Sequence, residues 1–560
     1  MPSIPRLKNF IKKHIKLVSF VVITLFFAAS VIIRISDFNQ SNDIQNIDAS
    51  YHVLLTMNAI DQAGIKSSSL LPLVSLTTDS AGPAVPWGAT VKGNDGLFYY
   101  TSFPQIGFAL PSIIFDYGHI PVTLFNLMLF NMLVGYISVI LLFVICFLIA
   151  RSLTKNEIKA HLLALTVSIL AMFSIEVMFS QGVIYWGQSL MQPILLSQLI
   201  IVFALLQQKK KSTLLVILLA LVILLGIMTE WTGYFSALGI LLLCIVKAAK
   251  DKQWRQYAPL VISVLVGGII GTLLFVTPFI VKLSAPLFVE TSMSRFIVRD
   301  STNQDAPGLI AMLGSYVDSF GPFIIATLFV LAVALAHPPT RTALFTSLRR
   351  HAGLLFIATF PLLENVLLRQ HAYEYSFDRL KFVIPLSMFL VIILASLKTR
   401  RTLLIALGAI SIAIAVSLTQ YTHSQRTAVT PGYTDTSEIL SYTKEAYPNA
   451  TYLFNGPVRG WLNNATGKNI IEQVQSYKSF RDNCTVGICV WLIGTATDNS
   501  MYIVRGALVF DSSQNKLTTI GTPSFDGLLY VDEDLRERLE QTKSSTLKQD
   551  YLLKEFKQSI

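Results

Sequence analysis

The chain has 560 residues, of which 53% are hydrophobic and 14% are charged, and its mean hydropathy is +0.57. It is too apolar for a soluble globular protein and too long for one membrane span, so we expect a polytopic, mainly α-helical membrane protein. The formal net charge of +11 would suit nucleic acid, but the excess lies in short loops between apolar segments. Membrane topology explains such loops, and we therefore expect no nucleic-acid partner.

The amino terminus is predicted to lie in the cytoplasm. Four lysines precede the first apolar stretch, Leu17 to Ile33, and positive charge beside a span stays inside. The connection that follows, residues 35–121, is therefore external. A long external loop that carries carboxylates favours chemistry at the outer face of the membrane.

This external loop opens with three aspartates and a short helical pattern. The aspartates are Asp37, Asp43 and Asp48. At helical spacing, Asp48, Tyr51 and His52 share one face. A carboxylate beside an imidazole is suited to act as a general base toward a hydroxyl. An aspartate in front of a helix is also a common N-cap, and on the residues alone the capping role ranks first.

Aromatic residues dominate the rest of the loop. They lie in Pro86-Trp87-Gly88 and in residues 97–104, LFYYTSFP. Flat apolar faces with hydroxyl partners suit a sugar or an isoprenoid chain, although Trp and Tyr also gather at membrane interfaces without further function. Ile106 to Phe115, interrupted by Pro111, is expected to form an interfacial helix or a re-entrant segment.

Apolar segments long enough to span a membrane recur along the first three quarters of the chain, given that a span needs roughly 20 residues and fewer with snorkelling ends. We predict about 11 spans: Leu17–Ile33, Val122–Ala150, His161–Phe179, Met191–Leu206, Thr213–Met228, Tyr234–Val246, Pro259–Ile280, Phe320–Ala336, Ala352–Leu367, Phe382–Leu397 and Thr402–Leu418. Every loop predicted to be internal is basic. An odd number of spans then brings the carboxyl-terminal region to the outside.

The external connection after the ninth span is dense in ionisable residues. It reads RQHAYEYSFDRLK from Arg369 to Lys381. If it is helical, His371, Tyr375 and either Asp378 or Arg379 line one face. Cations interleaved with carboxylates and tyrosines suit a phosphate at headgroup depth. Arg or Lys at the end of a span is more often an anchor, but the density here and Glu364 nearby favour function.

Three further candidates lie on the same predicted side of the membrane. Glu230 ends the fifth span, and Arg295 and Arg299 lie in the loop after the seventh. A loop arginine is usually solvated, and Glu230 is equally explained as marking the water boundary. Their shared side is the reason to include them.

The tail, residues 419–560, is predicted to be a soluble external α/β domain. Helical and β-branched patterns alternate along it at 437–445, 490–493, 502–510 and 528–531. It contains no P-loop, dinucleotide-binding glycine pattern or zinc-ligand spacing. Cys484 and Cys489 are expected to form a small disulfide if the tail is outside, with two free thiols as the alternative. Cys146 and Cys244 lie in apolar segments and are expected to be core residues.

Together these features resemble the type C glycosyltransferases, the clan of protein O-mannosyltransferases and the bacterial aminoarabinose transferase, which use polyprenyl-phosphate sugars. The residues that carry the resemblance lie in Asp48 to His52, Pro86 to Gly88, Tyr99 to Pro104 and His371 to Lys381. They span the first three quarters of the chain. The resemblance implies a membrane glycosyltransferase domain at 1–418 that moves a sugar from a lipid-linked donor to a glycan, lipid or protein acceptor.

The resemblance also implies residue roles, and it places Asp48 above the capping interpretation. Asp48, with His52 beside it, would be the catalytic base of an inverting transfer. Arg379 and Lys381, with Arg295 or Arg299, would stabilise the departing lipid phosphate. Tyr51, Glu230, His371, Tyr375 and Asp378 would complete the substrate and lipid-phosphate site. No nucleotide is needed.

The sequence departs from the clan at its acidic pair, having Asp48-Ala49 where Asp-Glu is common. Use of a divalent cation, and the choice of base among the three aspartates, therefore stay open. A lipid or polysaccharide transporter or flippase would instead place ionisable residues near the middle of the membrane in two related halves. A surface-polysaccharide polymerase or ligase, or a non-catalytic envelope assembly protein, is a further alternative. In each case we expect an inner-membrane protein in contact with membrane lipid.

Overall fold

The computed structural model describes residues 4–36, 42–44, 46–76, 89–208, 210–299, 307–423, 427–429, 433–456, 462, 466, 468, 470–471, 474–496 and 502–521. The chain forms two compact units. The first comprises Met1–Phe38 and Ser102–Gln425, and the second comprises Asn39–Thr101 and Arg426–Ile560. The predicted domain limits, 1–418 and 419–560, stay a prediction.

The regular elements of the first unit, within its described residues, are helices. Its elements are α1 (Ile4–Ser36), α4 (Ile106–Tyr117), α5 (Leu124–Leu153), α6 (Glu157–Met172), α7 (Ile175–Ser180), α8 (Gly187–Gln207), α9 (Thr213–Thr229), α10 (Thr232–Asp251), α11 (Trp254–Leu283), α12 (Ala285–Arg299), α13 (Leu309–Ala336), α14 (Pro338–Thr359), η1 (Phe360–Leu362), α15 (Leu363–Leu367), α16 (Arg369–Glu374), η2 (Ser376–Phe382), α17 (Val383–Ser396) and α18 (Arg400–Thr422). Side chains of Thr123, Asn156 and Thr399 cap α5, α6 and α18 by accepting a backbone N–H.

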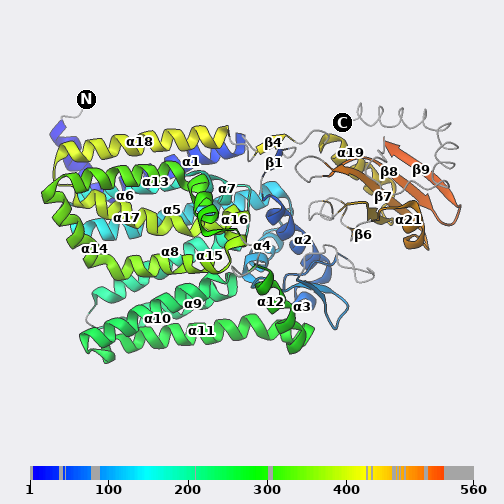
Figure 1. Ribbon diagram of the computed structural model, residues 1–560, viewed down its shortest axis with the longest axis horizontal. Helices are drawn as coiled ribbons and strands as arrows, with labels where there is room; N and C mark the ends of the chain where they lie inside the picture. The colour runs from blue at the N-terminus through cyan, green and yellow to red at the C-terminus, as the bar shows by residue number, and fades with distance from the viewer. Residues whose placement is uncertain are drawn as a thin grey trace. The chain divides into compact units, whose positions relative to one another are not determined.

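The long helices of this unit run roughly parallel to a common axis (Figure 1). Helix α17 lies at the centre and packs against α5, α6, α13 and α14. Of its most apolar stretch, within Ser376–Ser396, 89% is buried inside the protein. The corresponding share for the peripheral helix Arg400–Thr422 is 22%. The peripheral helices therefore turn apolar faces outward, as lipid requires.

Eight helices of the described residues are long and apolar enough to cross a membrane. They coincide with eight of the predicted spans, and the chain is a polytopic helical membrane protein. The other three predicted spans fall on α6, α9 and α14, and two of these helices are short, with 16 and 17 residues. The predicted count of about 11 is therefore not confirmed. The segment interrupted by Pro111 is a 12-residue helix, α4.

The part of the second unit before Thr101 consists of short elements. They are β1 (Asn42–Ile44), α2 (Asp48–Ala63), α3 (Ile65–Ser68), β2 (Thr90–Lys92) and β3 (Phe98–Tyr100). Strands β2 and β3 form an antiparallel hairpin, and β1 pairs with β4 (Thr427–Val429). The predicted aromatic segment Pro86-Trp87-Gly88 and Asp37 lie outside the described residues.

The tail contains a mixed five-stranded sheet in the order β6-β5-β7-β8-β9. Its elements are α19 (Tyr433–Ala446), β5 (Thr451–Phe454), β6 (Ile470–Ile471), α21 (Tyr477–Asn483), β7 (Ile488–Ala496), β8 (Tyr502–Asp511) and β9 (Lys516–Gly521). The predicted elements at 437–445, 490–493 and 502–510 are confirmed. The strand predicted at 528–531 lies outside the described residues.

Alternating side chains of this sheet form two apolar cores. Val490 and Leu492 of β7 join α19 in one core, whereas Trp491 lies with Phe480 of α21 in the other. This period of two is the pattern of a strand that is buried on both faces. The predicted disulfide between Cys484 and Cys489 is present, and it joins the end of α21 to the start of β7.

Candidate functional site

The ionisable connection before α17 is not one continuous helix. Helix α16 ends at Glu374, Tyr375 is extended, and a 3-10 helix, η2, follows. The predicted face forms by another route: the rings of His371 and Tyr375 lie 4.6 Å apart, and His371 Nδ1 lies 3.4 Å from Asp378 Oδ2.

Lys381 is the central cation of this connection. Its ammonium lies 2.6 Å from Glu364 Oε2 and 3.2 Å from Asp378 Oδ1, and all three side chains are at least 96% buried. It also donates to Thr232 Oγ1 at 3.1 Å, and Thr232 in turn donates to Glu364. Lys381 is therefore the hub of a buried ionic network and not only a membrane anchor.

Glu230 joins the same network from the turn between α9 and α10. The amide Nε2 of Gln188, at the start of α8, donates to Glu230 Oε1 and to Asp378 Oδ1, both at 3.1 Å. A Cβ at Gly187 would lie 3.1 Å from the Thr229 carbonyl oxygen. Glycine at 187 therefore allows the close approach of α8 to the end of α9 that brings Gln188 to Glu230.

Glu230, Glu364 and Asp378 each offer a carboxylate oxygen within 4.8 Å of those of the other two. Burial, together with the negative charges of Glu364 and Asp378, raises the pKa of Glu230 well above its usual value. Such a group of hard oxygen ligands is able to share a proton or hold a cation. We call Glu230, Glu364, Asp378 and Lys381 the carboxylate cluster.

Aromatic rings surround His371, which adjoins the carboxylate cluster. The ring of Phe103 lies 5.9 Å from that of His371, and it also packs against Trp186. The Arg299 guanidinium lies 5.6 Å from the centre of the Phe103 ring. Burial lowers the pKa of His371, although Asp378 acts to raise it. An imidazole, an aromatic wall and an arginine therefore meet at this place.

Arg379 belongs to a second buried network. Its Nε donates to Ser319 Oγ at 2.9 Å, and Nη1 donates to the carbonyl oxygens of Ala372 and Tyr373. Ser319 Oγ donates to Glu176 Oε2 at 2.8 Å. Ser319 precedes Phe320, where α13 leaves helical geometry. The arginine is thus fixed between a helix break and a buried carboxylate.

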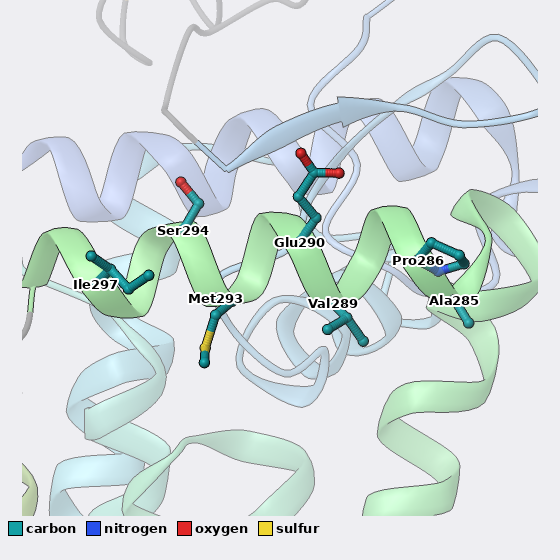
Figure 2. Close-up of a pocket in the computed structure, with 7 residues that line it drawn as sticks. All are labelled: Ala285, Pro286, Val289, Glu290, Met293, Ser294 and Ile297. Carbon is teal, nitrogen blue, oxygen red and sulfur yellow. The ribbon is translucent and has the colours of Figure 1, made fainter.

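Arg295 and Arg299 lie on α12, which follows a sharp turn at Ser284 (φ 84°) after α11. Seven residues of α12 line a cavity of about 820 Å³: Ala285, Pro286, Val289, Glu290, Met293, Ser294 and Ile297. Figure 2 shows Val289 and Met293 on the side of the helix opposite Glu290 and Ser294. Helix α12 is amphipathic, as expected for a segment beside a membrane.

Asp48, Tyr51 and His52 lie on α2 in the second unit. Asp48 is the first residue of the helix and Ile47 occupies the N-cap position, without a side-chain cap. His52 is buried and its ring lies 4.6 Å from that of Tyr100. Burial lowers the pKa of His52 well below its usual value. These three residues belong to a different unit from the carboxylate cluster.

Sequence reasoning did not single out four residues of the buried networks. They are Glu176, Gln188, Thr232 and Ser319. Glu176 lies within an apolar segment, and an ionisable residue there is itself a signal of function. Gln188 and Thr232 are uncharged residues that resemble ordinary helix starts, so their role depends on tertiary contacts.

The fold is similar to that of ArnT from Cupriavidus metallidurans. Against ArnT in the apo state the TM-score is 0.52 at 11% identity, covering 88% of this chain and 98% of ArnT. Against ArnT bound to undecaprenyl phosphate the TM-score is 0.53 at 10% identity, covering 84% and 92%. No family model and no curated protein matches the sequence. The comparison confirms the predicted fold of the type C glycosyltransferases.

Proposed function

From the fold shared with ArnT, we propose that this chain is a membrane glycosyltransferase that moves a sugar from a polyprenyl-phosphate donor to a hydroxyl acceptor. The observation that carries the proposal is a match over most of both chains, in which one ArnT structure holds undecaprenyl phosphate. The buried ionisable networks of η2 support it, since such residues in a membrane protein are costly and usually functional. The acceptor is a glycan, a lipid or a protein.

Asp48 is the proposed general base. It takes the proton of the acceptor hydroxyl as the oxygen attacks the anomeric carbon from the face opposite the phosphate. The bond from the anomeric carbon to the phosphate oxygen breaks, the configuration inverts, and polyprenyl phosphate leaves with the bonding electrons. His52 and Tyr51, on the same helix, complete the acceptor side in this proposal.

Four cations are proposed to stabilise the departing phosphate. Arg295 and Arg299 lie on the amphipathic helix α12 and are assigned to direct contact. Lys381 and Arg379 are each fixed by several buried partners, and they are assigned to positions behind the two arginines that contact the phosphate. Glu230, His371, Tyr375 and Asp378 hold these cations and the wall of the site.

The orientation proposed for the reaction is external. The amino terminus lies in the cytoplasm and the tail outside, in the inner membrane, because every loop predicted to be internal is basic. The lipid-linked donor would then present its sugar at the outer face.

A deletion strain and the purified protein together test this proposal. The strain should accumulate a lipid-linked sugar, identified by mass spectrometry. The protein in nanodiscs should convert that lipid to free polyprenyl phosphate when acceptor extract is added. Movement of the intact lipid-linked sugar across vesicle membranes, without release of polyprenyl phosphate, would instead establish the flippase alternative. Absence of both accumulation and release would overturn the proposal.

A further inference from the structure

The carboxylate cluster contains more buried carboxylates than buried cations. Its three carboxylates contribute three negative charges and Lys381 one positive charge, which leaves a net charge of −2 when all are ionised. Glu230 is 1% exposed, Glu364 2% and Asp378 1%. Charges at this depth are stable only when they are paired, neutralised by protons or bound to a metal ion.

Three buried oxygens in or beside the cluster have no hydrogen-bond partner among the described residues. Oε1 of Gln188 accepts no hydrogen bond from any described residue, although the side chain is 4% exposed and its amide contacts two of the three carboxylates. Among the described residues, Glu230 Oε2 and Asn365 Oδ1 are likewise buried acceptors without a hydrogen-bond partner. Asn365 reaches the cluster through its Nδ2, which donates to the Asp378 carbonyl at 3.2 Å. A buried acceptor that is left without a hydrogen bond destabilises the folded protein.

We propose that the carboxylate cluster binds one hard divalent cation, of the class of Mg²⁺, Mn²⁺ or Ca²⁺, through Glu230, Glu364 and Asp378. Such cations take carboxylate and amide oxygens at about 2.0–2.6 Å, and ligand atoms within 4.8 Å of one another are close enough to share one ion. A charge of +2 balances the cluster. Nothing in this inference depends on the reaction proposed above.

Gln188 supplies the fourth protein ligand. Its amide now directs nitrogen to Glu230 and Asp378. A cation between these carboxylates favours the orientation rotated by 180°, in which Oε1 faces the ion, because an amide oxygen can bind such a cation and an amide N–H cannot. The cation then ties the start of α8 and the turn between α9 and α10 to α15 and η2.

Titration of Mn²⁺ into the full-length protein in nanodiscs, after dialysis against EDTA, tests the inference by electron paramagnetic resonance. We expect one bound Mn²⁺ per chain, displaced by Mg²⁺ or Ca²⁺, and a higher midpoint of thermal unfolding with Mn²⁺ present. Glu230→Gln should weaken Mn²⁺ binding at least 10-fold and abolish the thermal shift. The matched control is Glu176→Gln, which removes a fully buried carboxylate outside the cluster and should keep the wild-type affinity.

Two results would overturn the cation site. One is wild-type protein that binds no Mn²⁺ at millimolar concentration, in which case the cluster is neutralised by protons. The other is equal binding by wild type and Glu230→Gln. If Glu230→Gln does not fold, the thermal shift of the wild-type protein still decides. A protein that transfers sugar but binds no Mn²⁺ refutes this inference alone, and one that binds Mn²⁺ without any transfer refutes only the proposed reaction.

Discussion

At the scale of single residues, a substitution of Asp48 distinguishes a catalytic role of its carboxylate from a structural one. Asp48→Asn preserves size and most helix-start preference but removes the base, so we expect turnover to fall by roughly 100-fold or more with unchanged expression. Sugar transfer from the lipid-linked donor measures it. The control is Asp61→Asn, which removes an exposed carboxylate from the same helix.

The opposite result would be informative for the same residue. If Asp48→Asn retains near-normal transfer while Asp37→Asn or Asp43→Asn abolishes it, the reaction stands with a different base. If all three variants stay active, the mechanism as written is wrong. Ile47, and not Asp48, occupies the N-cap position, so loss of capping would not explain a large effect.

His52 predicts a dependence of stability on pH. Its pKa in the folded protein lies below the unfolded value of 6.5 because of burial. As the pH falls, the unfolded chain therefore binds a proton at a higher pH than the folded chain does. Its contribution to stability is full above pH 6.5 and falls as the pH drops, by up to about 1.4 kcal/mol per pH unit. Thermal unfolding of wild type and His52→Gln between pH 7.5 and pH 5 measures it. The variant should lose less stability on acidification, and parallel curves would contradict the assignment.

A substitution at Gly187 tests the close contact between α8 and the end of α9 that places Gln188 beside Glu230. A Cβ there would lie 3.1 Å from the Thr229 carbonyl oxygen, so Gly187→Ala must displace backbone and should destabilise the protein by about 1–3 kcal/mol. The midpoint of thermal unfolding measures the change. Gly408→Ala is the matched control, because α18 offers open space at that position and alanine favours helix. Equal midpoints for the two variants would refute the close contact.

At the scale of elements, the disulfide fastens α21 to β7. Replacing Cys484 and Cys489 by Ser should lower the free energy of unfolding of the tail by about 2 kcal/mol, since the closed loop is short. Hydrogen exchange of α21 and β7 in the full-length protein should rise accordingly. Reductant should produce the same rise in wild type and no further rise in the variant. Unchanged exchange would show that Phe480 and Trp491 suffice to hold the two elements together.

At the scale of the whole molecule, the direction of insertion is the property to test. Fusions after Thr422, at the end of α18, should give active alkaline phosphatase and dark green fluorescent protein, because the preceding Lys398, Arg400 and Arg401 stay inside. Fusions within residues 209–211 should give the reverse. A fluorescent fusion after Thr422 would show that the topology is the reverse of the predicted one. The proposed reaction would then take place at the cytoplasmic face.

Much of the fold was readable from the chain itself. Long apolar segments must become helices that satisfy their own backbone in lipid, and eight of these were located directly. Alternation of apolar residues likewise located β7 and β8 of the tail. Two cysteines five positions apart in a polar region indicated the disulfide that joins them. Each of these signals lies in a short stretch of sequence, so it can be recognised without knowledge of the tertiary contacts.

Tertiary structure decided the composition of the ionic networks. The segment from Arg369 to Lys381 has no proline or glycine to end a helix, yet it breaks at Tyr375, and across this break Asp378 contacts His371. Gln188 and Thr232 carry no charge that would mark them, and only packing of α8 and α10 brings them to Glu230 and Lys381. Burial of charge is a property of the assembled bundle, and no short stretch of sequence contains it.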